Sequence, residues 1–195
     1  SLQNLRTDHF DLYQHHGVSS LEEVEKILGP GGAHEAFLEA RKAGKVRFLG
    51  FSAHSVEAAL ALMDAFAFDT ILFPVNYVAW HAGSFGAQVL ARAQEKKMGI
   101  LAIKSLAKGL WPGAAKRTHP KCWYEPVSQP DEALMALRFT LSLPVTALIP
   151  PGDENIFRMA LGLAAKFSPL SQEEADAIKQ KALKAIPLFK YPQKT

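Results

Sequence analysis

Short apolar or β-branched runs alternate with amphipathic segments along most of the chain. The runs lie at residues 10–15, 46–51, 69–73, 99–103 and 146–149. Between them, apolar residues recur every three or four positions, as Val56, Leu60 and Met63 do, which is the spacing of one helix face. The run at 99–103 is almost wholly apolar, as in strands of a parallel sheet covered on both faces. The pattern therefore predicts five strand–helix units in succession.

Local signals predict where several helices begin and end. Gly44 is expected to end the helix at 34–42 in the left-handed conformation that glycine adopts easily. One stripe of the helix after residue 153 should carry Ile156, Ala160 and Phe167, and a final helix should run to about residue 185. Two pairs have the spacing of a capping box, in which each side chain bonds the other residue's free amide: Ser20 with Glu23, and Ser171 with Glu174.

Successive strand–helix units join parallel strands through right-handed crossovers. The two architectures that such units build are an open doubly wound sheet and a (β/α) barrel. The sequence contains no G-x-G-x-x-G after a predicted strand and no G-x-x-x-x-G-K-[ST], which are the nucleotide-binding signatures of the open sheets. Their absence favours the barrel.

Composition and charge narrow the choice of partners. Lys and Arg number 22 and Asp and Glu 19, so the net charge of +3 is too small to indicate a nucleic-acid or membrane partner. No run of 18 apolar residues occurs. The single cysteine, Cys122, excludes an intramolecular disulfide, and no second pair of His or carboxylate residues beside His15 and His16 has metal-ligand spacing. We expect a cytoplasmic protein without a metal site, although secreted proteins can also lack disulfides.

Polar and titratable side chains follow the predicted strands, where a parallel barrel has its site. His15 and His16 end the first run, Ser52 follows the second, and Lys104 and Ser105 follow the fourth. Adjacent strand residues point to opposite faces, so at most one of the two histidines faces a barrel interior. A histidine there can bond a substrate oxygen and relay a proton. Any strand also ends in a polar loop, so a structural role stays open.

Lys104 admits two interpretations. A lysine at an apolar strand end can have a lowered pKa and then form a Schiff base, or it can bind a phosphate group. The alternative is an ordinary solvated charge. Both interpretations are compatible with the sequence.

Two long segments carry a resemblance to a known family. Residues 1–16, SLQNLRTDHFDLYQHH, resemble the aldo-keto reductase pattern S-L-x-x-L-x-T-D-x-x-D-L-Y-x-x-H. Residues 40–52 resemble that family's A-x-x-x-G-K-[IV]-R-x-[IL]-G-x-S, and the downstream elements follow in the same order. The resemblance implies a (β/α)8 TIM-barrel type of α/β fold that reduces aldehydes and ketones with NADPH. The first predicted strand matches the family's fourth, which implies an incomplete barrel of about five βα units plus a C-terminal helix. Residues 1–195 would then form a single partial domain whose N-terminal βα units are missing.

The resemblance also assigns site residues. His16 matches the histidine of the family's Asp–Tyr–Lys–His tetrad, which helps to orient the substrate carbonyl, whereas the other three members have no counterpart in this chain. The matched cofactor positions are Ser52 for the nicotinamide carboxamide, Lys104, Ser105, Leu106 and Gly109 in the loop over the pyrophosphate, and Pro151, Gly152 and Arg158 after the last strand. Ala53 stands where the family usually has Asn, and Ile103 stands where many members have a stacking aromatic residue.

The leading hypothesis is an NADPH-dependent aldo-keto reductase-like oxidoreductase acting on a small-molecule carbonyl substrate. This chain would be an inactive or incomplete fragment, because it has no counterpart of the catalytic Tyr, Lys and Asp. The loop 108–129, with Trp111, Trp123 and Tyr124, would form an apolar wall of the site. The alternative is a non-catalytic binding or self-assembling module, a homo-oligomer whose second copy covers the open sheet edges.

Overall fold

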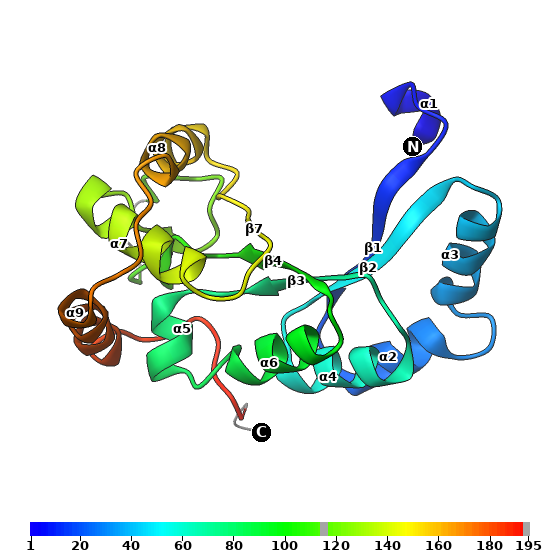
Figure 1. Cartoon of the computed structure of the whole chain (residues 1–195), viewed down its shortest axis with the longest axis horizontal. Helices are drawn as coiled ribbons and strands as arrows, with labels where there is room; N and C mark the ends of the chain where they lie inside the picture. Colours follow the sequence, from blue (N-terminus) through cyan, green and yellow to red (C-terminus); the bar gives the residue numbers. More distant parts are fainter. Residues whose placement is uncertain (114–116, 193–195) are drawn as a thin grey trace. The chain divides into compact units, whose positions relative to one another are not determined.

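The computed structural model describes residues 1–113 and 117–192 and has an α/β fold with a parallel sheet of five strands (Figure 1). Residues 114–116 of the predicted loop 108–129 lie outside the described residues. The strands confirm the five predicted runs: β1 (Phe10–Val18), β2 (Val46–Ala53), β3 (Thr70–Pro74), β4 (Gly99–Ile103) and β7 (Ala147–Leu148). The chain divides into two compact units, Ser1–Phe73 with Val89–Ile100 and Pro74–Gln88 with Leu101–Thr195.

The first unit places helices against three neighbouring parallel strands. Its helices are α1 (Leu2–Leu5), α2 (Leu21–Leu28), α3 (Ala33–Lys42), α4 (Val56–Ala65) and most of α6 (Ala87–Glu95). In the sheet, His15 lies opposite Phe51, and Phe51 lies opposite Ile71. The core consists of side chains from β2, β3 and α4 that are completely buried: Leu49, Phe51, Ile71, Leu62 and Met63.

The predicted caps are largely confirmed. Gly44 follows α3 with a φ of 71°, a left-handed conformation that favours glycine. The Ser171 box is complete, since both of its reciprocal bonds form. At the other box the Ser20 hydroxyl accepts from the Glu23 amide, but the Glu23 carboxylate accepts from Ser19 instead of Ser20.

The two adjacent histidines of β1 point to different environments. His15 is 4% exposed and its ring stacks on Phe37, with 3.9 Å between centroids. Its Nε2 lies 3.1 Å from Nδ1 of buried His34, so one neutral ring donates and the other accepts. Burial, with a smaller effect of His34, lowers the pKa of His15 to about 4, and burial also lowers the pKa of His34. His15 is therefore part of the core, and His16 is the exposed member of the pair.

The second unit is built around β4 and β7, which pair in parallel. Its helices are α5 (Tyr77–Ala82), α7 (Pro130–Leu141), α8 (Glu154–Ala164) and α9 (Gln172–Leu183). A small antiparallel pair, β5 (Ala107–Gly109) with β6 (Glu125–Pro126), follows β4. The apolar core joins these elements through buried residues that include Leu106, Val127, Leu137, Ile156, Ala160 and Ile178.

Several short elements were not predicted from the sequence, and the apolar stripe predicted for α8 extends beyond the end of that helix. Helices α1 and α5 are only four and six residues long, too short for a helical period to show in the sequence. The strands β5 and β6 contain three and two residues. Phe167 was expected on α8 but lies beyond its end and is 42% exposed. The amides of Lys166 and Phe167 bond carbonyls only three residues back, so the helix tightens and stops before Pro169.

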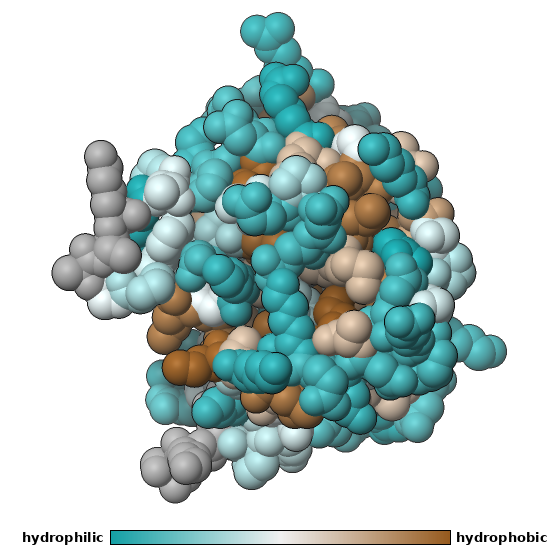
Figure 2. All heavy atoms as spheres, turned by 90° about the vertical axis from the view of Figure 1, so that its left-hand side faces the viewer, coloured by the Kyte–Doolittle hydropathy of each residue, from teal (hydrophilic) through white to brown (hydrophobic). Residues whose placement is uncertain are grey.

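Polar side chains interrupt the apolar surface around the helices of the second unit. Figure 2 shows apolar patches set among hydrophilic side chains on the side where α7, α8 and α9 lie in Figure 1. Exposed apolar residues of these helices are Phe157, Leu161 and Leu183. Phe157 and Leu161 lie one turn apart on α8 and form a small patch, and exposed apolar residues in this number are ordinary on a folded surface.

We predict that the first unit loses stability as the pH falls from about 6.5 to about 4. The pKa of His15 is depressed in the folded state. The unfolded chain therefore binds a proton in this window while the folded chain does not, and the stability is fully present only above about 6.5. The expected loss is roughly 2 to 3 kcal/mol, measured by urea unfolding across the pH series. In His15→Phe the loss should be smaller, and in the exposed control His16→Gln it should match the unsubstituted chain. An equal loss in all three proteins would contradict the assignment.

Candidate functional site

His16 and Ser52 lie at the carboxyl ends of the neighbouring strands β1 and β2. The His16 side chain is exposed, whereas Ser52 is only 2% exposed. The register between the strands shifts between His15 and Val18, where Gly17 has a φ of 67°. This irregularity turns the amide of Gly17, the residue after His16, onto the Ser52 hydroxyl oxygen, 2.6 Å away. The two predicted residues of the first unit therefore belong to one local structure.

The hydrogen bond from Gly17 also fixes what Ser52 can offer a ligand. A hydroxyl has one donor and two acceptor positions, and the Gly17 amide occupies one of the acceptors. The O–H proton is left to donate to an acceptor such as an amide carbonyl. This chemistry suits the carboxamide role that the sequence resemblance assigned to Ser52.

Lys104 lies in the second unit, directly after β4. Its backbone has a φ of 65°, in the left-handed region that residues other than glycine seldom adopt. The Lys104 carbonyl accepts from the Ala107 amide at 2.9 Å, so the chain makes a tight turn at the strand end. The side chain lines a cavity of about 210 Å³ together with Trp123 and Tyr124.

The amine of Lys104 has an unusual environment for a lysine. Its Nζ lies 5.0 Å from the centroid of the Tyr124 ring and 5.6 Å from that of Trp123. Burial lowers the pKa of Lys104, and the neighbouring Cys122 opposes this shift. Lys108, four residues on, bonds Glu125 at 2.9 Å, and this bond raises its pKa. The pKa values of Lys104 and Lys108 are therefore shifted in opposite directions.

The other predicted cofactor residues divide into those near Lys104 and those elsewhere in the second unit. Pro151 and Gly152 line the same cavity as Lys104. Gly109 lines a different cavity with Trp111, and Arg158 is exposed on α8. The structure thus brings Lys104, Pro151 and Gly152 together but not Gly109.

Ser105 and Leu106 are both buried, with different consequences. The Ser105 hydroxyl has no hydrogen-bond partner among the described residues, although it is 1% exposed. Leu106 is completely buried in the apolar core, so its side chain serves packing, and its carbonyl accepts from Val127. Leu106 therefore offers no side-chain contact to a cofactor, and Ser105 has hydrogen-bonding capacity that the protein does not use.

Sequence reasoning did not place Lys121 and Cys122 at the site, although both line the Lys104 cavity. The hairpin β5–β6 folds residues 121–124 back beside β4, and its strands are too short to predict. Lys121 bonds Glu154 at 3.0 Å, and Asp153 caps α8 through the amides of Asn155 and Ile156. These bonds fix the residues beside the cavity. The charge of Lys121 is paired with Glu154 and is not available to a ligand in the cavity.

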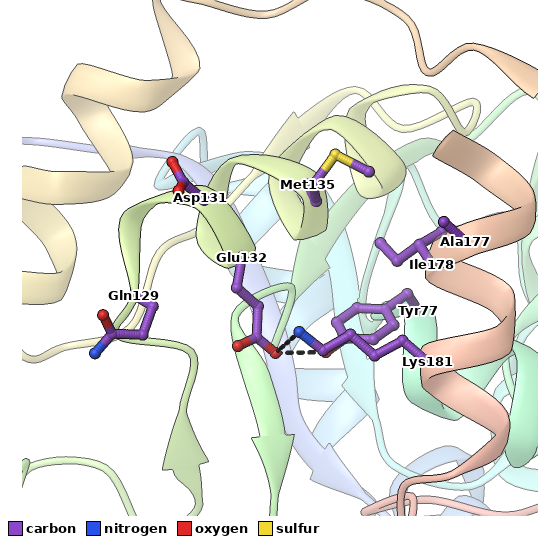
Figure 3. A pocket seen from close by; sticks show the side chains of 8 residues that line it. All are labelled: Tyr77, Gln129, Asp131, Glu132, Met135, Ala177, Ile178 and Lys181. Carbon is purple, nitrogen blue, oxygen red and sulfur yellow. Dashed lines mark hydrogen bonds and ion pairs between the residues drawn. The ribbon is translucent and has the colours of Figure 1, made fainter. Parts of the chain in front are cut away.

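A second cavity of the same unit contains none of the predicted residues. It has a volume of about 420 Å³ and lies between α5, α7 and α9 (Figure 3). Glu132 accepts from the Tyr77 hydroxyl at 3.1 Å and from the Lys181 amine at 2.9 Å. Burial, with the adjacent Glu132, raises the pKa of Tyr77. The Tyr77 hydroxyl and the ion pair between Lys181 and Glu132 connect the three helices. These side chains therefore have a structural role.

The described residues form neither a metal-binding cluster nor a helix that could span a membrane. Among residues 1–113 and 117–192, no cluster of three His, Cys, Asp or Glu side chains is placed to hold a metal ion. Within the same residues, every helix is too short or too polar to cross a bilayer.

The fold and the strand-end residues define an α/β protein of the (β/α) barrel type. The family model for the aldo/keto reductase family matches residues 1–132, and the chain belongs to that family. A relative, aldo-keto reductase YhdN of Bacillus subtilis (strain 168), is 32% identical over 113 residues, or 58% of this chain and 31% of the relative.

Solved structures confirm the fold class. Aldo-keto reductase AKR11C1 from Bacillus halodurans (holo form) has a TM-score of 0.65 and 19% identity, covering 98% of this chain and 64% of that chain. An aldo-keto reductase from Klebsiella pneumoniae in complex with NADPH has a TM-score of 0.64 and 18% identity, covering all of this chain and 65% of that one. The chain thus spans about two thirds of these structures, and it has the fold of an incomplete TIM-type barrel.

We predict that Ser52→Ala destabilises the chain by roughly 1 to 2 kcal/mol, because the half-buried Gly17 amide loses its acceptor. Urea unfolding would measure the change. The matched control is Ser19→Ala, because the Ser19 hydroxyl is exposed and bonds the Gly17 carbonyl. The control should change stability by less than about 0.5 kcal/mol. Equal losses of stability in the two variants would contradict the larger contribution that we assign to the hydrogen bond between Gly17 and Ser52.

Proposed function

We propose that the chain forms the cofactor-binding part of an NADPH-dependent aldo-keto reductase that reduces small-molecule carbonyl compounds. The observation that carries the proposal is the group of Lys104, Pro151 and Gly152 around one cavity at the strand ends, in a chain of this family. Both units would then belong to one partial barrel domain, residues 1–195, in a cytoplasmic enzyme.

The residues present suit an anionic dinucleotide. Lys104 supplies a cation that lines the cavity and has no carboxylate partner among the described residues, whereas the Ser105 hydroxyl is unbonded but 1% exposed and does not line the cavity. Arg158, exposed on α8, is a second cation in the same unit. In the first unit, the free proton of the Ser52 hydroxyl suits the nicotinamide carboxamide. Leu106 and Gly109 would contribute backbone only.

When bound, NADPH supplies the hydride that a carbonyl carbon accepts. His16 is exposed at the end of β1, so its ring can donate a hydrogen bond to the carbonyl oxygen and orient it. The matched motifs contain no Tyr, Lys or Asp of the family tetrad. Losing several members of such a set costs orders of magnitude in rate. The 195-residue chain by itself should therefore bind cofactor but reduce carbonyl compounds negligibly.

Titration of the chain with NADPH, followed by nucleotide fluorescence, tests the proposal. We expect saturable binding that Lys104→Met weakens about tenfold or more, since a bond to a charged group contributes about 1.5–3 kcal/mol. Lys181→Met is the control, because Lys181 pairs with Glu132 at the other cavity. Binding that is absent, or equal in both variants, would contradict the cofactor site. Steady oxidation of NADPH by a simple aldehyde would contradict the predicted lack of turnover.

Exposed apolar residues of the first unit favour a second candidate, a self-associating module. Phe48 is 46% exposed and Tyr13 40%, and β1 is the edge of the sheet among the described strands. An edge strand with large apolar neighbours is prone to pair with another chain. A second copy would cover it in a homo-oligomer. Sedimentation should then show a mass that rises with concentration and that Phe48→Lys lowers to the monomer. A monomer at all concentrations would contradict this candidate.

A further inference from the structure

The turn after β4 presents one lysine to a small, mostly apolar cavity. Trp123, Tyr124, Pro150 and Pro151 are among the residues that line this cavity. Its volume of about 210 Å³ is below the roughly 300–1,000 Å³ of pockets that hold drug-sized ligands. The cavity therefore suits a compact molecule with an apolar body. Lys104 is one of two lysines that line the cavity, the other being Lys121.

Three side chains with nucleophilic atoms line this cavity, and they differ in ion pairing and in protonation: Lys104, Lys121 and Cys122. Lys121 also lines it but pairs with Glu154 at 3.0 Å. The Cys122 thiol is 2% exposed and burial raises its pKa, which keeps it protonated and unreactive. Lys104 pairs with no carboxylate among residues 1–113 and 117–192, and burial lowers the pKa of its amine although the rings of Trp123 and Tyr124 offer it cation–π contacts. An amine without an acidic partner in an apolar surround loses its proton more readily than a paired one.

We propose that the amine of Lys104 forms a reversible imine with small aldehydes that enter this cavity. The unprotonated nitrogen attacks the carbonyl carbon to give a carbinolamine. Loss of water then forms the C=N bond, so an amine and an aldehyde give an imine and water without oxidation or reduction. Added borohydride delivers hydride to the imine carbon and leaves a stable secondary amine on the lysine.

Borohydride trapping with benzaldehyde on the native 195-residue chain tests the proposal, with adducts located by peptide mass spectrometry. We expect at least about threefold more adduct on Lys104 than on Lys108 or Lys121, which are ion-paired controls of the same chain. In concentrated urea the excess on Lys104 should disappear. Lys104→Arg should remove this adduct and leave the labelling of the other lysines and the thermal unfolding unchanged.

Equal labelling of Lys104 and the two control lysines would overturn the proposal. So would an excess on Lys104 that persists in urea, because it would then arise from the local sequence and not from the cavity. The result does not depend on the proposed cofactor site, since trapping is done without nucleotide. NADPH titration decides the cofactor site separately, so either proposal can fail while the other stands.

Discussion

The buried, apolar parts of the strands leave little room for polar side chains except near the strand ends, and this constraint determines where chemistry can occur in the chain. The last five residues of β2 are all buried, and β4 is apolar throughout. Polar groups therefore lie where the strands finish: His16 near the end of β1 and Ser52 at the end of β2 in the first unit, and Lys104 after β4 in the second. In the first unit, the parallel strands β1 and β2 finish at the same edge, so this constraint places His16 and Ser52, which are far apart in the sequence, together among the site candidates.

The same constraint explains how much of the fold was predictable. Apolar runs and capping residues are local signals, and they predicted all five strands and the complete box at Ser171. The site was predictable only in part. The sequence could not show that a left-handed turn at Lys104 and two very short strands would bring Trp123 and Tyr124 over one amine. Those contacts depend on tertiary packing of a loop, which leaves no periodic pattern.

The histidines illustrate the value of the side-chain environment. Two adjacent histidines are equivalent by composition, and the alternation of a strand says only that they face opposite ways. The structure separates them, since His15 stacks on Phe37 and bonds His34, whereas His16 is exposed. Leu106 shows the opposite case. It matches a family position, yet its complete burial assigns its side chain to the core.

The central claim is that NADPH binds at the Lys104 cavity. Hydrogen–deuterium exchange of the chain with and without NADPH tests it most directly, because one experiment follows backbone amides along the chain. We expect slower exchange in the nucleotide-bound state at residues 104–107 and at the amides of Gly152 and Asp153, around the Lys104 cavity. No change there, or protection confined to the cavity between α5, α7 and α9, would contradict it.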